Sequence, residues 1–152
     1  MNILLVCTGN TCRSPMAKGL LEKLLDEEGY HSINVDSAGI NVYVSTEASE
    51  NAIQVMRDMD IDISDHMSRQ VTREDIEEAD IILGMTPSHR NVLIDLYPQY
   101  ADKFHTLKEY AFGIDEAISD PFGEDIEAYA ECATEISEAI EAVFQKIKED
   151  EV

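Results

Sequence analysis

Positively charged residues are scarce in this sequence of 152 residues, where 11 lysines and arginines stand against 32 aspartates and glutamates. The formal net charge at pH 7 is therefore −21. A nucleic-acid backbone or an anionic membrane surface repels a chain with this charge. We therefore expect no nucleic-acid partner and no membrane partner, and an acidic surface that attracts basic protein segments.

Long apolar runs and cysteines are also few. No run approaches the roughly 18 residues that span a bilayer, and the first residues lack the basic start and the cleavage site of a signal peptide. Three cysteines are too few, and odd in number, for a disulfide scaffold. These absences predict a protein of the reducing cytoplasm.

The remaining composition is that of a globular protein, with 44% hydrophobic and 28% charged residues. No internal repeat and no linker rich in proline, glycine or serine divides the chain. The length suffices for one hydrophobic core. We therefore expect a single domain over residues 1–152.

Short apolar runs alternate with stretches of helical spacing. The pattern predicts strands over residues 3–6, 33–36, 80–84 and 103–106, and helices over 15–28, 47–59, 87–96 and about 126–147. Residues 37–39 are expected to form a turn. Strands that alternate with helices indicate an α/β fold with a parallel sheet. Its ligand site should lie beyond the carboxyl ends of the strands, where the first strand meets its helix.

Residues that carry chemistry gather in that strand-to-helix loop. In order they are Cys7, Thr8, Gly9, Asn10, Thr11, Cys12, Arg13 and Ser14, the pattern Cys-x5-Arg-Ser. The backbone N–H groups of such a loop can point inward and bind an anion at the start of the helix, with Gly9 giving the backbone its freedom. These dipoles and Arg13 would favour the thiolate of Cys7.

Two further side chains in the loop suit phosphoryl transfer. Arg13 offers a planar fork for two oxygens of a tetrahedral anion, and Ser14 can donate to the sulfur when it becomes a leaving group. A nucleotide site is not expected, because no Gly-Lys-Ser or Gly-Lys-Thr follows Gly9. The alternative is that Cys7 is an inert core thiol.

A phosphoryl-transfer nucleophile also needs an acid for its leaving group. Asp120, in the segment Asp120-Pro121-Phe122-Gly123, is the candidate. Taken alone, an Asp-Pro pair is typical of a helix start. Together with Cys7 and Arg13 it predicts a general acid, with Phe122 as a wall of the substrate pocket.

Three segments, from Cys7 to Pro15, from Ser37 to Gly39 and from Asp120 to Gly123, resemble the low-molecular-weight protein tyrosine phosphatase family. The resemblance covers nearly the whole chain. It implies a three-layer α/β/α fold with a four-stranded parallel sheet and a phosphocysteine intermediate, with no metal and no cofactor. It also implies roles by position: Cys7 as nucleophile, Arg13 as phosphate ligand, Ser14 as helper of the thiolate, Asp120 as acid and then base, and Asn10, Ser37 and His66 as supports of the loop. We expect a monomer.

Several residues depart from the tyrosine-directed pattern. They are Thr11, Phe122 and the pair Met85-Thr86, and all resemble the bacterial protein arginine phosphatase branch. The resemblance implies arginine-phosphorylated proteins as substrates, bound by Thr8, Gly9, Asn10, Thr11, Cys12 and Phe122. Thr11 can contact a planar guanidinium, and Asp120 can pair with it. A tyrosine phosphatase that acts on tyrosine-phosphorylated proteins remains the alternative.

The other cysteines allow two interpretations. Cys12 either fills space in the loop or forms a disulfide with Cys7 that switches activity off under oxidation. Cys132 is expected to pack in the last helix. The four histidines, at positions 31, 66, 89 and 105, have no spacing typical of a metal site.

Two rival functions use the same loop. A thiol-linked arsenate reductase needs further cysteines in a later segment, and residues 80–95 contain none. A non-catalytic anion-binding protein would not need the full set of Cys7, Arg13, Ser14 and Asp120.

Overall fold

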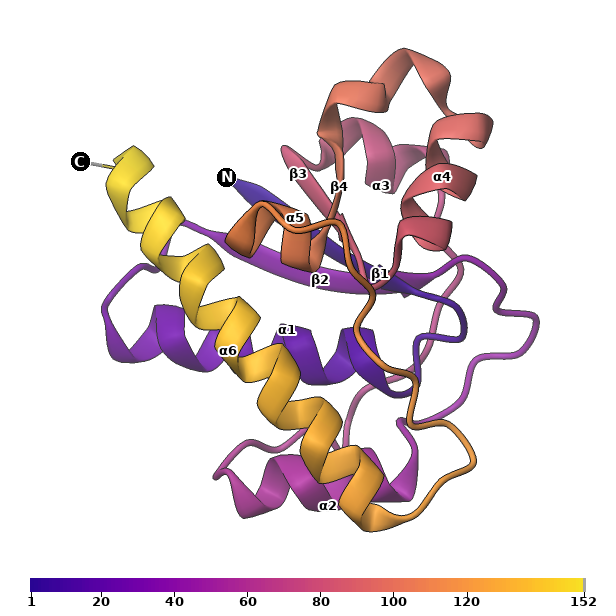
Figure 1. Ribbon diagram of the computed structural model, residues 1–152, viewed down its shortest axis with the longest axis vertical. Coiled ribbons are helices and arrows are strands. Elements are labelled where there is room, and N and C mark those ends of the chain that lie inside the picture. Colours follow the sequence, from indigo (N-terminus) through magenta and orange to yellow (C-terminus); the bar gives the residue numbers. More distant parts are fainter. Residues whose placement is uncertain (152) are drawn as a thin grey trace.

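The computed structural model describes residues 1–151, and its centre is a parallel sheet (Figure 1). The strands are β1 (Asn2–Cys7), β2 (Asn34–Gly39), β3 (Ile81–Gly84) and β4 (Phe104–Thr106). Their order is β2-β1-β3-β4, and every neighbouring pair is parallel. The predicted α/β class with a four-stranded parallel sheet is confirmed.

Helices cover both faces of this sheet and complete three layers (Figure 1). One face carries α1 (Arg13–Glu27), α2 (Glu50–Asp58), α5 (Leu107–Phe112) and α6 (Ile126–Glu151). The other carries α3 (Arg73–Glu78), α4 (Pro87–Leu96) and the 3-10 turn η1 (Pro98–Lys103). Successive β1 side chains point to opposite faces, so Leu5 packs with α1 and α6 while Leu4 packs with α3 and α4.

The long helix α6 follows its predicted pattern. Its inward residues recur every three or four positions and are buried: Tyr129, Ala133, Ile136, Ile140, Val143, Phe144 and Ile147. Cys132 is buried in the same face, as predicted. Within residues 1–151, no helix has the length and apolarity that crossing a bilayer requires.

Three local predictions differ from the structure. Residues 37–39 extend β2 instead of turning, because Ser37 pairs with Leu5 and Gly39 with Cys7. Helix α2 begins at Glu50 and not at residue 47, since the Ser49 side chain caps it by accepting from the Ala52 N–H. The short helices α3 and α5 were not predicted, because six residues are too few to show a helical period.

Candidate active site

The sulfur of Cys7 lies at the carboxyl end of the central strand β1, where the sheet rule places a ligand site. Cys7 is 3% exposed. Its Sγ accepts from the backbone N–H of Asn10 at 3.2 Å and lies 2.9 Å from Ser14 Oγ. An N–H and a hydroxyl thus lie within reach of the sulfur, which is the arrangement that stabilises a thiolate.

Asn10 holds the middle of the loop in shape. Its φ is +56°, a left-handed conformation that asparagine tolerates better than most residues. Its side-chain amide donates to Ser14 Oγ at 2.8 Å and to Ser37 Oγ at 3.0 Å. Its Oδ1 accepts from the backbone N–H of Arg69 at 3.1 Å, and its carbonyl lies 2.8 Å from His66 Nε2. Segments distant in the chain therefore fix this one residue.

Arg13 joins the loop to the segment that carries Asp120. The guanidinium is buried, and its Nη1 donates to the carbonyl of Ile118 at 2.9 Å. Its Nη2 lies 3.5 Å from Asp120 Oδ2. An arginine so held presents its remaining N–H groups to an anion in the loop, and it brings a carboxylate beside that anion.

Asp120 and Phe122 lie in an exposed turn. The Asp120 side chain is 54% exposed, and its Oδ1 accepts from the Phe122 N–H at 3.1 Å. Phe122 is 72% exposed. The turn is anchored where the N–H of Ile118 donates to the carbonyl of Met85 at 2.8 Å. The carboxyl and the aromatic ring thus face solvent, whereas the sulfur is buried.

Cys12 contacts groups that the sequence analysis missed. Its Sγ lies 3.2 Å from the hydroxyl of Tyr129 and 3.5 Å from Ser49 Oγ. Burial raises the pKa of Tyr129 to about 12, so this phenol keeps its proton near neutral pH. Tyr129 lies within the helix expected over residues 126–147, but nothing in the sequence points to this contact. All the cysteines are free thiols.

The sequence did not predict two other contacts of the loop that carries Cys7. Arg69 supports Asn10 through its backbone and pairs with Asp36 and Asp75 at 2.8 Å each. His89 Nε2 lies 2.8 Å from Thr8 Oγ1. The sequence could have indicated that His89 lies near the loop. His89 follows β3 in the first turn of α4, and residues there approach the same sheet edge as Cys7.

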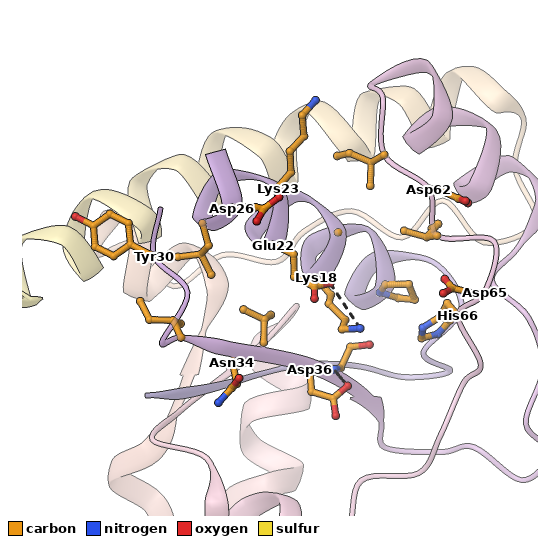
Figure 2. A pocket seen from close by; sticks show the side chains of 18 of the residues that line it. Lys18, Glu22, Lys23, Asp26, Tyr30, Asn34, Asp36, Asp62, Asp65 and His66 are labelled. Carbon is orange, nitrogen blue, oxygen red and sulfur yellow. Dashed lines mark hydrogen bonds and ion pairs between the residues drawn. The ribbon is translucent and has the colours of Figure 1, made fainter. Parts of the chain in front are cut away.

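A groove with a volume of about 790 Å³ lies elsewhere, between α1 and β2 (Figure 2). Nine of its 22 lining residues are charged, among them Lys18, Glu22 and Asp36 (Figure 2). Cys7, Arg13 and Asp120 do not line it. Within residues 1–151, no group of three histidine, cysteine, aspartate or glutamate side chains is placed to hold a metal ion.

Comparison with known proteins decides the family. The description "Low molecular weight phosphotyrosine protein phosphatase" belongs to the family model that matches residues 2–152. The chain belongs to this family. The protein-arginine-phosphatase of Bacillus subtilis (strain 168) is 37% identical over 150 residues, which cover 99% of each protein.

Solved structures of phosphatases share this fold. One is the YwlE arginine phosphatase variant with a phosphorylated active-site serine: the TM-score is 0.94, the identity 36%, and the match covers 99% of this chain and 97% of that one. Another is the low molecular weight protein tyrosine phosphatase from T. tengcongensis: the TM-score is 0.91, the identity 39%, and the match covers 96% of this chain and 99% of that one.

Proposed function

We propose that this protein is a cysteine-dependent protein-arginine phosphatase that works through a phosphocysteine intermediate. One arrangement carries the proposal: the Cys7 sulfur receives the Asn10 N–H at 3.2 Å, while Arg13 reaches Asp120 at 3.5 Å. The 37% identity to a protein-arginine-phosphatase over nearly the full chain supports phosphoarginine as the substrate.

The first step transfers the phosphoryl group to the enzyme. The Cys7 thiolate attacks phosphorus, so that an S–P bond forms and the P–N bond of phosphoarginine breaks. Arg13 and the loop N–H groups bind the phosphoryl oxygens. Asp120 gives its proton to the departing nitrogen, and the arginine leaves as a guanidinium. The phosphorylated active-site serine of the YwlE variant supports an intermediate on the enzyme.

The second step frees the enzyme. Asp120, now a carboxylate, takes a proton from water as the water oxygen attacks phosphorus. The S–P bond breaks, inorganic phosphate forms, and the electron pair returns to Cys7. Ser14 Oγ at 2.9 Å and the Asn10 N–H stabilise the thiolate as it leaves.

Specificity for arginine depends on the rim of the loop. Thr11 is half-buried there, and its hydroxyl can meet the N–H groups of a guanidinium. Asp120 becomes a carboxylate once it has given its proton to the departing nitrogen, and it can then pair with the guanidinium that leaves. Backbone and side chains of Thr8, Gly9, Asn10, Thr11 and Cys12, with the ring of Phe122, complete the substrate contacts.

Phosphate release from an arginine-phosphorylated protein and from a phosphotyrosine peptide, measured in parallel, tests this function. We expect a strong preference for phosphoarginine and no release by Cys7→Ser, which keeps a similar shape but has a poor nucleophile. Preference for phosphotyrosine would overturn the substrate, and release by Cys7→Ser would overturn the mechanism.

A tyrosine phosphatase is the second candidate. The structure from T. tengcongensis favours it, because that protein is named a tyrosine phosphatase and is 39% identical to this chain. The same residues would perform the same two steps, with Asp120 protonating a phenolate oxygen in place of nitrogen.

The proposed enzyme acts as a single domain over residues 1–152, as a monomer in the cytoplasm. It uses no metal and no cofactor, since a thiolate, an arginine and a carboxyl group supply every step above. Val152 lies outside the described residues.

The pair Cys7 and Cys12 forms a reversible oxidation switch in this proposal. Peroxide converts the Cys7 thiolate to a sulfenic acid, and attack by the Cys12 thiol forms the disulfide and releases water. After peroxide treatment, mass spectrometry should find a peptide cross-linked between Cys7 and Cys12, and a reductant should restore activity. Sulfonic acid at Cys7 without a cross-link would contradict the switch.

A further inference from the structure

His89 is a buried histidine that the mechanism above does not use. It is 6% exposed, and its Nε2 lies 2.8 Å from the hydroxyl oxygen of Thr8, the residue that follows the nucleophile. Its Nδ1 is buried and has no hydrogen-bond partner within residues 1–151. The ring therefore makes one polar contact, and that contact is to the phosphate loop.

The junction between β3 and α4 aims this ring at the loop. Thr86 caps α4 by accepting from the His89 N–H at 3.1 Å, which fixes the backbone of His89. Gly84 leaves room for the side chain, because a Cβ at that position would lie 3.0 Å from His89 Cβ.

The single contact determines which nitrogen carries the proton. Burial, aided by repulsion from Arg13, lowers the pKa of His89 to about 4, so the ring is neutral near pH 7. A neutral ring has one N–H. A buried N–H without an acceptor is rarer in proteins than a buried acceptor without a donor. The proton therefore belongs on Nε2, which donates to Thr8 Oγ1.

Because the Thr8 hydroxyl oxygen accepts from His89 Nε2, the hydrogen of this hydroxyl is free to donate elsewhere. The backbone of Thr8 is already held, because its carbonyl accepts from the Asn41 N–H at 3.0 Å. The contact with His89 therefore restricts the rotation of the Thr8 side chain. We propose that His89 is a positioning residue, which holds Thr8 so that its hydroxyl donates to an oxygen of the transferring phosphoryl group. The inference rests on the proposed phosphatase function and adds a donor to its loop.

Variants at both positions test the coupling, with turnover of an aryl phosphate and inhibition by orthovanadate as readouts. His89→Leu removes the donor, and His89→Gln can place an amide N–H near the position of Nε2. Thr8→Val removes the hydroxyl at an exposed position, where it should not disturb folding. His31→Leu is the matched control, because that ring is exposed and remote from the loop.

We expect kcat and vanadate affinity to fall about tenfold in both His89→Leu and Thr8→Val, the size of one charge-assisted hydrogen bond. The double variant should lose no more than either single variant, because the two residues act as one unit. His89→Gln should recover most of the kcat, and His31→Leu should match the unmodified protein. KM should change less than kcat, since the hydroxyl meets the phosphoryl group most closely in the transition state.

Two kinetic results would overturn the role of His89. One is an unchanged kcat in Thr8→Val, which stays informative even where His89→Leu folds poorly. The other is a double variant whose losses multiply. The affinity for vanadate distinguishes failure of this inference from failure of the proposed function. Failure to release phosphate from either protein substrate would refute the function, whereas equal vanadate affinity in all variants would refute the role of His89.

Discussion

The two loops of the candidate site are held in opposite ways. The nucleophile loop, residues 7–14, is mostly buried, and hydrogen bonds reach it from Ser37, His66 and Arg69. The acid loop, residues 113–125, crosses between α5 and α6 with little regular structure. It exposes both Asp120 and Phe122.

A few long-range contacts hold the acid loop. Arg90 Nη1 lies 2.7 Å from Asp115 Oδ1, and the Ser119 hydroxyl donates to Glu135 Oε2 at 3.1 Å. Ile118, buried at 1% exposure, is the anchor between them. A loop that binds a phosphoryl group needs hydrogen-bond donors in fixed positions. The acid that protonates the leaving group must instead stay accessible to a protein substrate. The comparison therefore separates changes that damage the fold from changes that damage only the chemistry.

Asp120→Asn should affect activity alone. We expect kcat on phosphoarginine to fall by about 10²–10⁴, the usual contribution of a general acid, with the free energy of unfolding unchanged. The kcat on an activated aryl phosphate should fall less, because its leaving group needs no proton. Asp125→Asn, in the same loop, is the control that should leave kcat intact. Equal losses on both substrates would contradict the role of Asp120 as the acid.

Asn10→Ala should affect activity and stability together. It removes the buried side-chain hydrogen bonds to Ser14, Ser37 and Arg69 and places alanine at a φ of +56°. We expect a loss of about 3 kcal/mol in the free energy of unfolding, measured by urea denaturation, and a severe loss of kcat. Asn10→Gly, which tolerates that φ, should recover part of the stability but not the activity. Full recovery of both would show that the hydrogen bonds contribute nothing.

Thr11→Ile tests specificity inside the nucleophile loop. The hydroxyl that can meet a guanidinium is replaced by an apolar group that suits an aromatic ring. We expect the ratio of phosphoarginine to phosphotyrosine activity to fall about tenfold, the size of one hydrogen bond to a charged group. Thr11→Ser, which keeps the hydroxyl, should leave the ratio close to its original value. An unchanged ratio in Thr11→Ile would exclude Thr11 as a determinant.

Asp115→Asn should have the smallest effect. The ion pair to Arg90 is half exposed on the Asp115 side, and such pairs contribute less than about 1 kcal/mol. We expect kcat to fall no more than about threefold, with the difference disappearing at high salt. A loss as large as that of Asp120→Asn would show that this tether, and not Ile118, places the acid.

Much of the fold was predictable because its signals are local. The apolar run of β1 and the three-to-four spacing of α6 appear as predicted. The prediction of a turn at residues 37–39 was wrong, because a strand end made of the small residues Ser-Ala-Gly shows no strand pattern until its partner β1 is known. The short helices α3 and α5 were not predicted, because six residues show no helical period. Their clearest signal is the cap that Thr72 and Thr106 provide.

The sequence by itself determined the nucleophile loop and its setting, because Cys7, Arg13 and Ser14 are neighbours on one strand-to-helix turn. Only the tertiary structure decided which distant groups meet that loop. Arg69 reaches Asn10, Tyr129 reaches Cys12, and His89 reaches Thr8. The reason is geometric: these contacts depend on the order of the strands and on the helices packed against them, which local patterns do not specify.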